Sequence, residues 1–205
     1  MPSAADYLPA KHSLTALKKG AADCRGCELY RRATQTVFGA GPASARVVLV
    51  GEQPGDQEDQ QGKPFVGPAG RLLDQTLAQV GIDRRSAYIT NAVKHFKWVA
   101  RGKRRLHAKP SARELAACWP WLQAELTTID PEMIVCLGAT AAQALLGRDF
   151  RVTRQRGKLL PSEFAKHILA TYHPSAILRA PEDARPQMLE AFTADLQVVA
   201  KVLAR

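Results

Sequence analysis

Three polar side chains follow apolar stretches of the chain and could share one site. Glu52 comes directly after the run Val47–Val50, Asn91 ends the run that starts at Ala87, and His173 follows the run Lys166–Tyr172. The carboxyl ends of parallel strands meet at one rim of a sheet, so these side chains are expected to lie together. A carboxylate, an amide and an imidazole can accept a proton, pair with a polar ring and stabilise a leaving anion. Taken singly, Asn91 and His173 fit ordinary turns equally well.

The loop after the first run is long and acidic. It extends from Gly51 to Gly70, is rich in glycine and proline, and carries carboxylates at Glu52, Asp56, Glu58 and Asp59. Loops at this place usually have about 2–6 residues, and a long loop often carries function. The segment contains neither GxxxxGK[ST] nor GxGxxG, and its acids would repel a phosphate. On composition alone, a solvated surface loop is the plain alternative.

The amino-acid sequence of this loop resembles a motif of a known protein family. GEQPGDQEDQQGKPFVGPAG resembles the first motif of the iron–sulfur family 4 type of the uracil-DNA glycosylase superfamily, GE-x-PG-xx-ED-xx-G-x-PFVG-x-AG, over some twenty positions. The resemblance implies that Asn91 pairs with uracil O4 and N3–H, and that His173, in HPSAILR, donates to O2. It also implies that Phe65, in PFVG, stacks on the base, and that Ser175 and Arg179 approach the DNA strand.

Two features depart from ordinary family 4 sequences. Gln53 stands where those enzymes usually have a small residue, and the loop after Asn91 contains Lys103-Arg-Arg-Leu-His107. Both resemble the UdgX branch of the superfamily, which becomes covalently linked to uracil-DNA. That resemblance implies that His107 attacks C1′ and that Glu52 or Asp56 accepts its other ring proton. Gln53 is then expected among the uracil-binding residues, and Lys103, Arg104 and Arg105 on phosphates.

The four cysteines fall as Cys24-x2-Cys27, Cys118 and Cys136. A disulfide framework is not expected in a cytosolic protein. Four thiolates can hold zinc or an iron–sulfur cluster, and spacing alone does not choose between them. A redox pair with two buried thiols is a further alternative. The family resemblance implies a [4Fe-4S] cluster on all four cysteines.

Length and charge restrict the class of protein. The chain has 205 residues, 46% of them hydrophobic, which suits one globular domain over 1–205 with a loose N-terminal tail at 1–11. No apolar run approaches about 18 residues and no signal-peptide pattern is present, so we expect a cytoplasmic protein without membrane contact, and a monomer. The formal net charge is +10, and eight basic residues without an acid lie between Lys94 and Arg113. This concentration favours DNA or RNA as partner.

Strand and helix patterns alternate along the chain. Runs at 47–50, 87–93, 132–137 and 166–172 predict buried strands, and 14–22, 68–80, 111–126, 139–146 and 185–203 predict helices. This order predicts an α/β fold, a three-layer α/β/α sandwich with a central four-stranded parallel sheet. Residues 94–110 are expected to form a long basic loop.

The sequence therefore predicts a protein that excises uracil from single- or double-stranded DNA and stays joined to the abasic sugar through His107. One alternative is a multiple-turnover family 4 glycosylase that uses water. Another is a non-catalytic iron–sulfur protein, which would bind nucleic acid independently of uracil and lose it at high salt.

Overall fold

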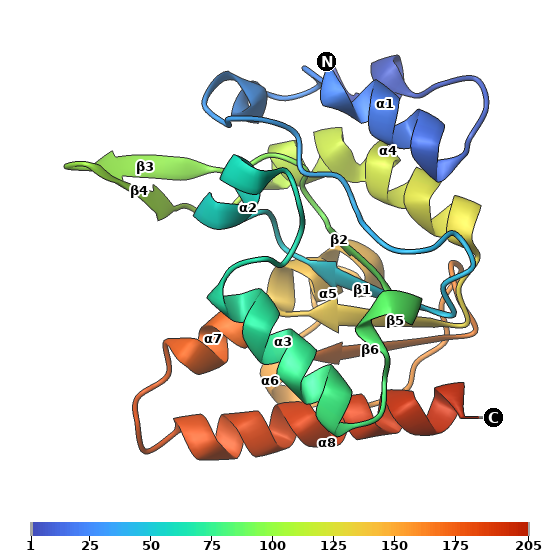
Figure 1. Cartoon of the computed structure of the whole chain (residues 1–205), viewed down its shortest axis with the longest axis vertical. Coiled ribbons are helices and arrows are strands. Elements are labelled where there is room, and N and C mark those ends of the chain that lie inside the picture. Colours follow the sequence, from blue (N-terminus) through green and yellow to red (C-terminus); the bar gives the residue numbers. More distant parts are fainter. Residues whose placement is uncertain (1, 205) are drawn as a thin grey trace.

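A four-stranded parallel sheet forms the centre of the molecule (Figure 1). The computed structural model describes residues 2–204, and its strands are β1 (Val47–Gly51), β2 (Tyr88–Asn91), β5 (Met133–Leu137) and β6 (His167–Thr171). They lie in the order β2-β1-β5-β6, and every neighbouring pair is parallel. β1 and β5 are continuous apolar runs, as expected for strands whose two faces are both covered. The predicted sheet is confirmed.

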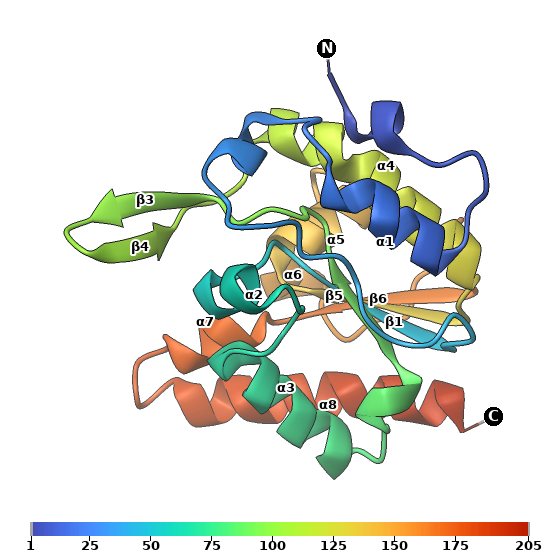
Figure 2. The same ribbon diagram turned by 45° about the horizontal axis from the view of Figure 1, so that its top comes forward.

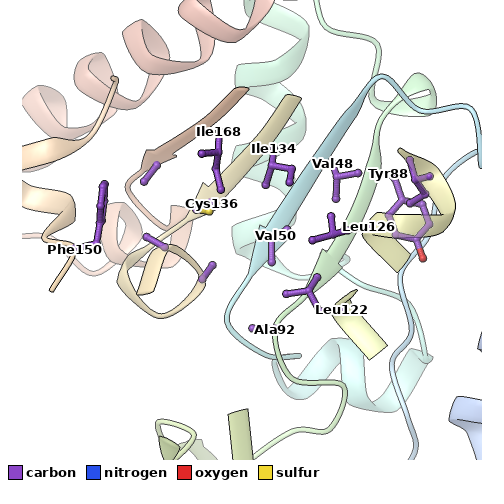
Figure 3. Packing of buried hydrophobic residues seen from close by; sticks show 14 of the residues in the cluster. Val48, Val50, Tyr88, Ala92, Leu122, Leu126, Ile134, Cys136, Phe150 and Ile168 are labelled. Atoms are coloured by element: carbon purple, nitrogen blue, oxygen red, sulfur yellow. The ribbon is translucent and has the colours of Figure 1, made fainter. Parts of the chain in front are cut away.

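Helices cover the two faces and complete the predicted three-layer sandwich (Figures 1 and 2). Alternate residues of β1 point to opposite sides. Val48 and Val50 pack toward α4 (Ala112–Ile129), α5 (Ala139–Leu146) and α6 (Val152–Gln155), as Figure 3 shows for Leu122 and Leu126 of α4. Val47 and Leu49 pack toward α3 (Pro68–Gln79) and α8 (Arg185–Leu203) on the other face.

The N-terminal segment packs on the outer side of α4. It contains η1 (Ala4–Tyr7), α1 (Leu14–Ala22) and η2 (Glu28–Arg31). The prediction of a loose tail at 1–11 is wrong for the described part, because Ser3 caps η1 and Ala4 is buried. A Cβ at Gly26 would come within 2.5 Å of the Ser3 and Ala4 backbone, so this turn is closed over the Cys24–Cys27 loop. Met1 lies outside the described residues.

The predicted basic loop at 94–110 contains a β-hairpin that projects from the body (Figures 1 and 2). Its strands are β3 (Trp98–Arg101) and β4 (Arg104–His107), with Gly102 at φ 58° in the turn. Turns of this kind need a positive φ, which glycine adopts easily. The sequence also did not predict η3 (Arg84–Ser86) or the short helices α2 (Asp56–Gln61) and α7 (Pro174–Leu178).

Within residues 2–204, every helix is too short or too polar to span a membrane.

A buried ion pair joins the end of β2 to α4. Lys94 and Glu125 are both fully buried, and Lys94 Nζ lies 2.5 Å from Glu125 Oε2. The ammonium also donates to Thr90 Oγ1 and to the carbonyl oxygen of Asn91, each at 2.7 Å. The carboxylate accepts further hydrogen bonds from Tyr88 and from the Gly39 N–H. A buried charge is tolerated only when it is paired and hydrogen-bonded in this way.

We predict that Lys94→Met strongly destabilises the fold, because it leaves the Glu125 carboxylate buried without its cation. Breaking one side of such a pair costs about 3–5 kcal/mol, which chemical denaturation would measure. Lys97→Met is the matched control, because the Lys97–Glu114 pair is partly exposed and should contribute about 1 kcal/mol or less. Equal losses in the two variants would contradict the importance of the buried pair.

Candidate functional site

The carboxyl ends of the strands open into a pocket of about 600 Å³. Glu52, Asn91 and His173 all line it, as expected from their places after β1, β2 and β6. Phe65 and His107 contribute to the same pocket from the loop before α3 and from the end of β4. The structure therefore brings together a carboxylate, an amide, an aromatic ring and two imidazoles.

Asn91 and Phe65 form the inner wall of the pocket against Gly51. A Cβ at Gly51 would lie 2.3 Å from Asn91 Oδ1 and 2.7 Å from the Phe65 ring, so only glycine fits there. Asn91 is 1% exposed, and its Oδ1 has no hydrogen-bond partner among the described residues. A buried acceptor without a partner costs free energy unless a ligand supplies the donor. The pocket is thus built to receive an N–H group at Asn91.

His173 faces Phe65 across the pocket with a fixed tautomer. The ring centroids of the two side chains lie 5.8 Å apart. The Ser175 N–H donates to His173 Nδ1 at 3.1 Å, so Nδ1 carries no proton and the neutral ring has its proton on Nε2. Burial lowers the pKa of His173 to about 4. Near neutral pH, His173 is therefore an uncharged hydrogen-bond donor.

Glu52 connects the sheet to the hairpin. Its Oε1 lies 3.2 Å from His107 Nε2, and its Oε2 accepts a hydrogen bond from the hydroxyl of Thr140, in the first turn of α5. Burial opposes ionisation of Glu52, but the hydrogen bonds from His107 and Thr140 outweigh it and hold its pKa below the usual value. Glu52 is thus an anion beside His107. Sequence reasoning missed Thr140, although it predicted the helix over 139–146 that carries this residue.

Arg105 fixes the hairpin to α2. Its guanidinium donates to Asp56 Oδ1 and Asp59 Oδ2, each at 2.6 Å. The fully buried Asp59 carboxylate also accepts from the N–H and hydroxyl of Thr34. Of the two carboxylates considered for His107, only Glu52 contacts it, because Asp56 is engaged by Arg105. Arg105 itself was expected on phosphates and lies instead in this ion-pair network.

The remaining predicted DNA contacts lie at the mouth of the pocket or on the hairpin. Lys103 and Arg104 are exposed around the hairpin turn. Ser175 and the exposed Arg179 line the pocket from α7 and its end.

Gln53, which was expected to bind uracil, lines the pocket, but its amide is bonded to the backbone of the hairpin. Its Nε2 donates to the carbonyl oxygens of Lys97 and Ala108, at 3.2 and 3.1 Å. Its Oε1 accepts from the Lys97 N–H at 3.0 Å. All hydrogen-bonding groups of the amide are therefore used by the two ends of the hairpin.

Three of the four cysteines gather beneath the N-terminal segment. Cys24, Cys27 and Cys118 belong to one packed cluster, and the Trp121 and Lys94 N–H groups donate to the sulfurs of Cys24 and Cys118 at 3.2 and 3.3 Å. Burial raises the pKa of Cys118 to about 12, with Cys24 and Cys27 contributing. Within residues 2–204, no three potential ligands are close enough for a single metal ion.

Cys136 lies apart from the other three. It is fully buried in β5, among the residues packed between the sheet and α5 (Figure 3). Burial alone raises its pKa, without a contribution from another cysteine. The prediction that all four cysteines hold one cluster is therefore wrong for Cys136: the inward-facing side of β5 buries its sulfur in the core. Cys24, Cys27 and Cys118, with N–H donors on two sulfurs, fit three positions of a cluster site.

The fold and the pocket together define an α/β protein with a pocket of polar and aromatic side chains at the carboxyl rim of its parallel sheet. Residues 38–197 match the model of the uracil DNA glycosylase superfamily. The type-4 uracil-DNA glycosylase of Thermotoga maritima is 39% identical over 157 residues, 76% of this chain and 78% of that protein. The chain belongs to the uracil-DNA glycosylase superfamily.

Other relatives agree with this assignment. The type-4 enzyme of Archaeoglobus fulgidus is 37% identical over 186 residues, 87% of each chain. The type-5 enzyme of Thermus thermophilus is 31% identical over 158 residues, 68% of each. The crystal structure of Pedobacter heparinus SMUG2 shares the fold, with a TM-score of 0.50, 15% identity and 77% of each chain covered.

We predict that the His173 ring stays neutral, with its proton on Nε2, from pH 8 down to about 5. The unfolded chain takes up this proton near pH 6.5, so the free energy of unfolding should fall as the pH decreases from about 6.5 toward 4. Nitrogen NMR of the ring would measure the titration, with a peptide of residues 170–180 as reference. A titration near pH 6.5 in the folded protein would contradict the assigned environment.

Proposed function

We propose that this protein excises uracil from DNA. The unpartnered, buried Oδ1 of Asn91 carries the proposal, because it can accept the N3–H of uracil while Nδ2 donates to O4. We assign the His173 Nε2–H as the donor to O2 and Phe65 as the aromatic face for a flipped base, because both side chains line the pocket. Cytosine has an amino group at C4 and no N3–H, so it meets the wrong pattern of donors and acceptors. The names of the type-4 relatives support the same activity.

Excision breaks the bond between N1 of uracil and C1′ of deoxyribose. The electron pair leaves with the base, and the sugar becomes an oxocarbenium ion. The negative charge that develops on the uracil oxygens is stabilised by the amide of Asn91 and by the Nε2–H of His173. The anionic Glu52 lies on the same rim and can stabilise the positive sugar. The reaction is completed by a nucleophile that attacks C1′.

Similarity to type-4 enzymes favours water as that nucleophile. Glu52 would position the water, and each protein molecule would act many times.

One observation favours a second candidate function, the covalent capture expected of the UdgX branch. His107 lies in the pocket with Nε2 against Glu52, which leaves Nδ1 as its other nitrogen. In this ring orientation Nδ1 forms the bond to C1′, and Glu52 accepts the Nε2 proton. A neutral N-alkyl imidazole departs poorly, so the adduct persists.

The positive charges fit a DNA substrate. We assign Lys103 and Arg104 of the hairpin, and Ser175 and Arg179 of α7 and its end, to the phosphate backbone. Arg105 is reassigned to holding the hairpin, because Asp56 and Asp59 neutralise its charge. Backbone contacts of this kind depend on salt, whereas the selection of uracil by Asn91 does not.

We propose a [4Fe-4S] cluster held by Cys24, Cys27, Cys118 and, as fourth ligand, His95. The buried His95 follows Lys94, whose N–H donates to the Cys118 sulfur, and its Nε2 lies 2.9 Å from Thr36 Oγ1. A second shell of this type orients a ligating histidine through its other nitrogen. The cluster would fasten the N-terminal segment to α4, at a distance from the chemistry of the pocket.

The proposal of covalent capture predicts that mixing the protein with a uracil-containing oligonucleotide yields a covalent protein–DNA adduct, detected by intact mass. His107→Ser should lose the adduct yet release uracil, because water can enter the vacated space. His167→Ser, a histidine at the opposite end of the sheet, is the control and should form the adduct normally. Many uracils released per wild-type protein without an adduct would establish water as the nucleophile, and binding that ignores uracil would indicate a non-catalytic protein.

We predict that Cys118→Ala and His95→Ala lose the brown colour and absorbance of the cluster, whereas Cys136→Ala keeps both. His95→Cys should keep a cluster with an altered spectrum, since a thiolate replaces an imidazole. Iron and sulfide analysis, together with electron paramagnetic resonance of the reduced protein, would measure this. A cluster that survives in His95→Ala and is lost in Cys136→Ala contradicts this ligand set.

A further inference from the structure

Gln53 joins the two ends of the hairpin at its base. Its amide makes three hydrogen bonds, with the N–H and carbonyl oxygen of Lys97, just before β3, and with the carbonyl oxygen of Ala108, just after β4. The side chain is buried, with 6% of the residue exposed. A backbone hydrogen bond also joins the two ends of the hairpin, since the Ala108 N–H donates to the Lys97 carbonyl oxygen at 3.0 Å. The hairpin is thus fastened to the residue that follows Glu52.

This fastening places His107 relative to Glu52. His107 pairs with Trp98 in the hairpin register and stands directly before Ala108. Glu52 and Gln53 are consecutive, so one residue contacts the His107 ring while the next holds the backbone of Lys97 and Ala108 at the two ends of the hairpin. An isolated two-stranded hairpin is at best marginally stable, so its position depends on such attachments.

The other attachments of the hairpin are made by its side chains. Arg105 is tied to Asp56 and Asp59, and the Trp98 indole N–H donates to the Arg32 carbonyl at 2.8 Å. The guanidinium of Arg32 also stacks over Trp98, 4.3 Å from the ring centroid. These contacts orient the inward face of the hairpin. Only Gln53, among the side chains described, bonds to the backbone on both sides of its base.

We propose that Gln53 is a positioning residue for His107, and that it decides whether the histidine or water reaches C1′ first. The inference rests on the proposed covalent capture. A nucleophile held in place outcompetes solvent only while its geometry is kept, and a displacement of about 1 Å can cost about 100-fold in rate. Loss of the three amide hydrogen bonds frees the hairpin base, and water then captures a larger share of the oxocarbenium ion. A small residue at position 53 would not supply this fastening.

The test compares Gln53→Ala and Gln53→Glu with the wild-type protein. Alanine removes all three hydrogen bonds, whereas glutamate keeps the size of the side chain but replaces two donated bonds by repulsion between a carboxylate and two carbonyl oxygens. We expect the ratio of adduct to free uracil to fall about 10- to 100-fold in both variants. Gln143→Ala is the matched control, since Gln143 donates to the Phe150 carbonyl away from the hairpin and should leave the ratio unchanged.

Hydrogen exchange of the DNA-free proteins separates the possible results. We expect the amides of residues 98–107 to exchange faster in both Gln53 variants, with α8 unchanged. An unchanged ratio of adduct to uracil in Gln53→Ala would overturn the positioning role, even if exchange becomes faster. A wild-type protein that forms no adduct would reject capture by His107 and, with it, the competition assigned to Gln53. The exchange data would still show whether Gln53 holds the hairpin.

Discussion

The contact between Glu52 and His107 is the constraint on which the account of this molecule depends. It joins the carboxyl end of β1 to the end of β4, two segments far apart in the sequence, at 3.2 Å. Thr140 occupies one oxygen of Glu52, which leaves the other for the histidine. Arg105 and Gln53 fix the hairpin from its inner face and from its base. Without these contacts, nothing would fix the half-exposed His107 imidazole of the projecting hairpin at the pocket. A two-stranded element would not hold it there unaided.

The charges of the pocket suit the departure of an anionic base. Glu52 is ionised and His173 is neutral, so the side of the pocket proposed to face the sugar is negative, while the side proposed to face the base can donate a hydrogen bond without a positive charge. The backbone of Asn91 is fixed by Lys94, which donates a hydrogen bond to the Asn91 carbonyl oxygen and forms a buried ion pair with Glu125. The same Lys94 donates its N–H to Cys118. The region proposed for the cluster and the residue proposed to select uracil are therefore parts of one rigid wall.

Much of the fold could be predicted from the sequence, and the reasons are local. β1 and β5 are uninterrupted apolar runs, β2 and β6 lie within the predicted runs, and α8 begins and ends at the residues that its pattern indicated. The end of a parallel strand predicts a shared rim, so Glu52, Asn91 and His173 were expected together. The hairpin was not found, because its strands are short, carry three arginines and expose Val99 and Leu106, so that they resemble a solvated loop. The predictions for the N-terminal tail, Cys136 and Gln53 were wrong because each position depends on packing between distant segments. The tail packs through η1 on the loop that holds Cys24, Cys136 is buried where β5 packs against α5, and the Gln53 amide bonds to the hairpin backbone. Neither spacing nor composition contains such information.

The measurement that tests the central claim most directly is peptide mapping of the protein after reaction with uracil-containing DNA. Tandem mass spectrometry of the trypsin-digested, nuclease-treated product would locate the deoxyribose. The account predicts a modification on His107, within the short peptide that follows Arg105, in stoichiometric yield with released uracil. An unmodified His107 in a protein that has released uracil, or a sugar attached to any other side chain, would contradict it.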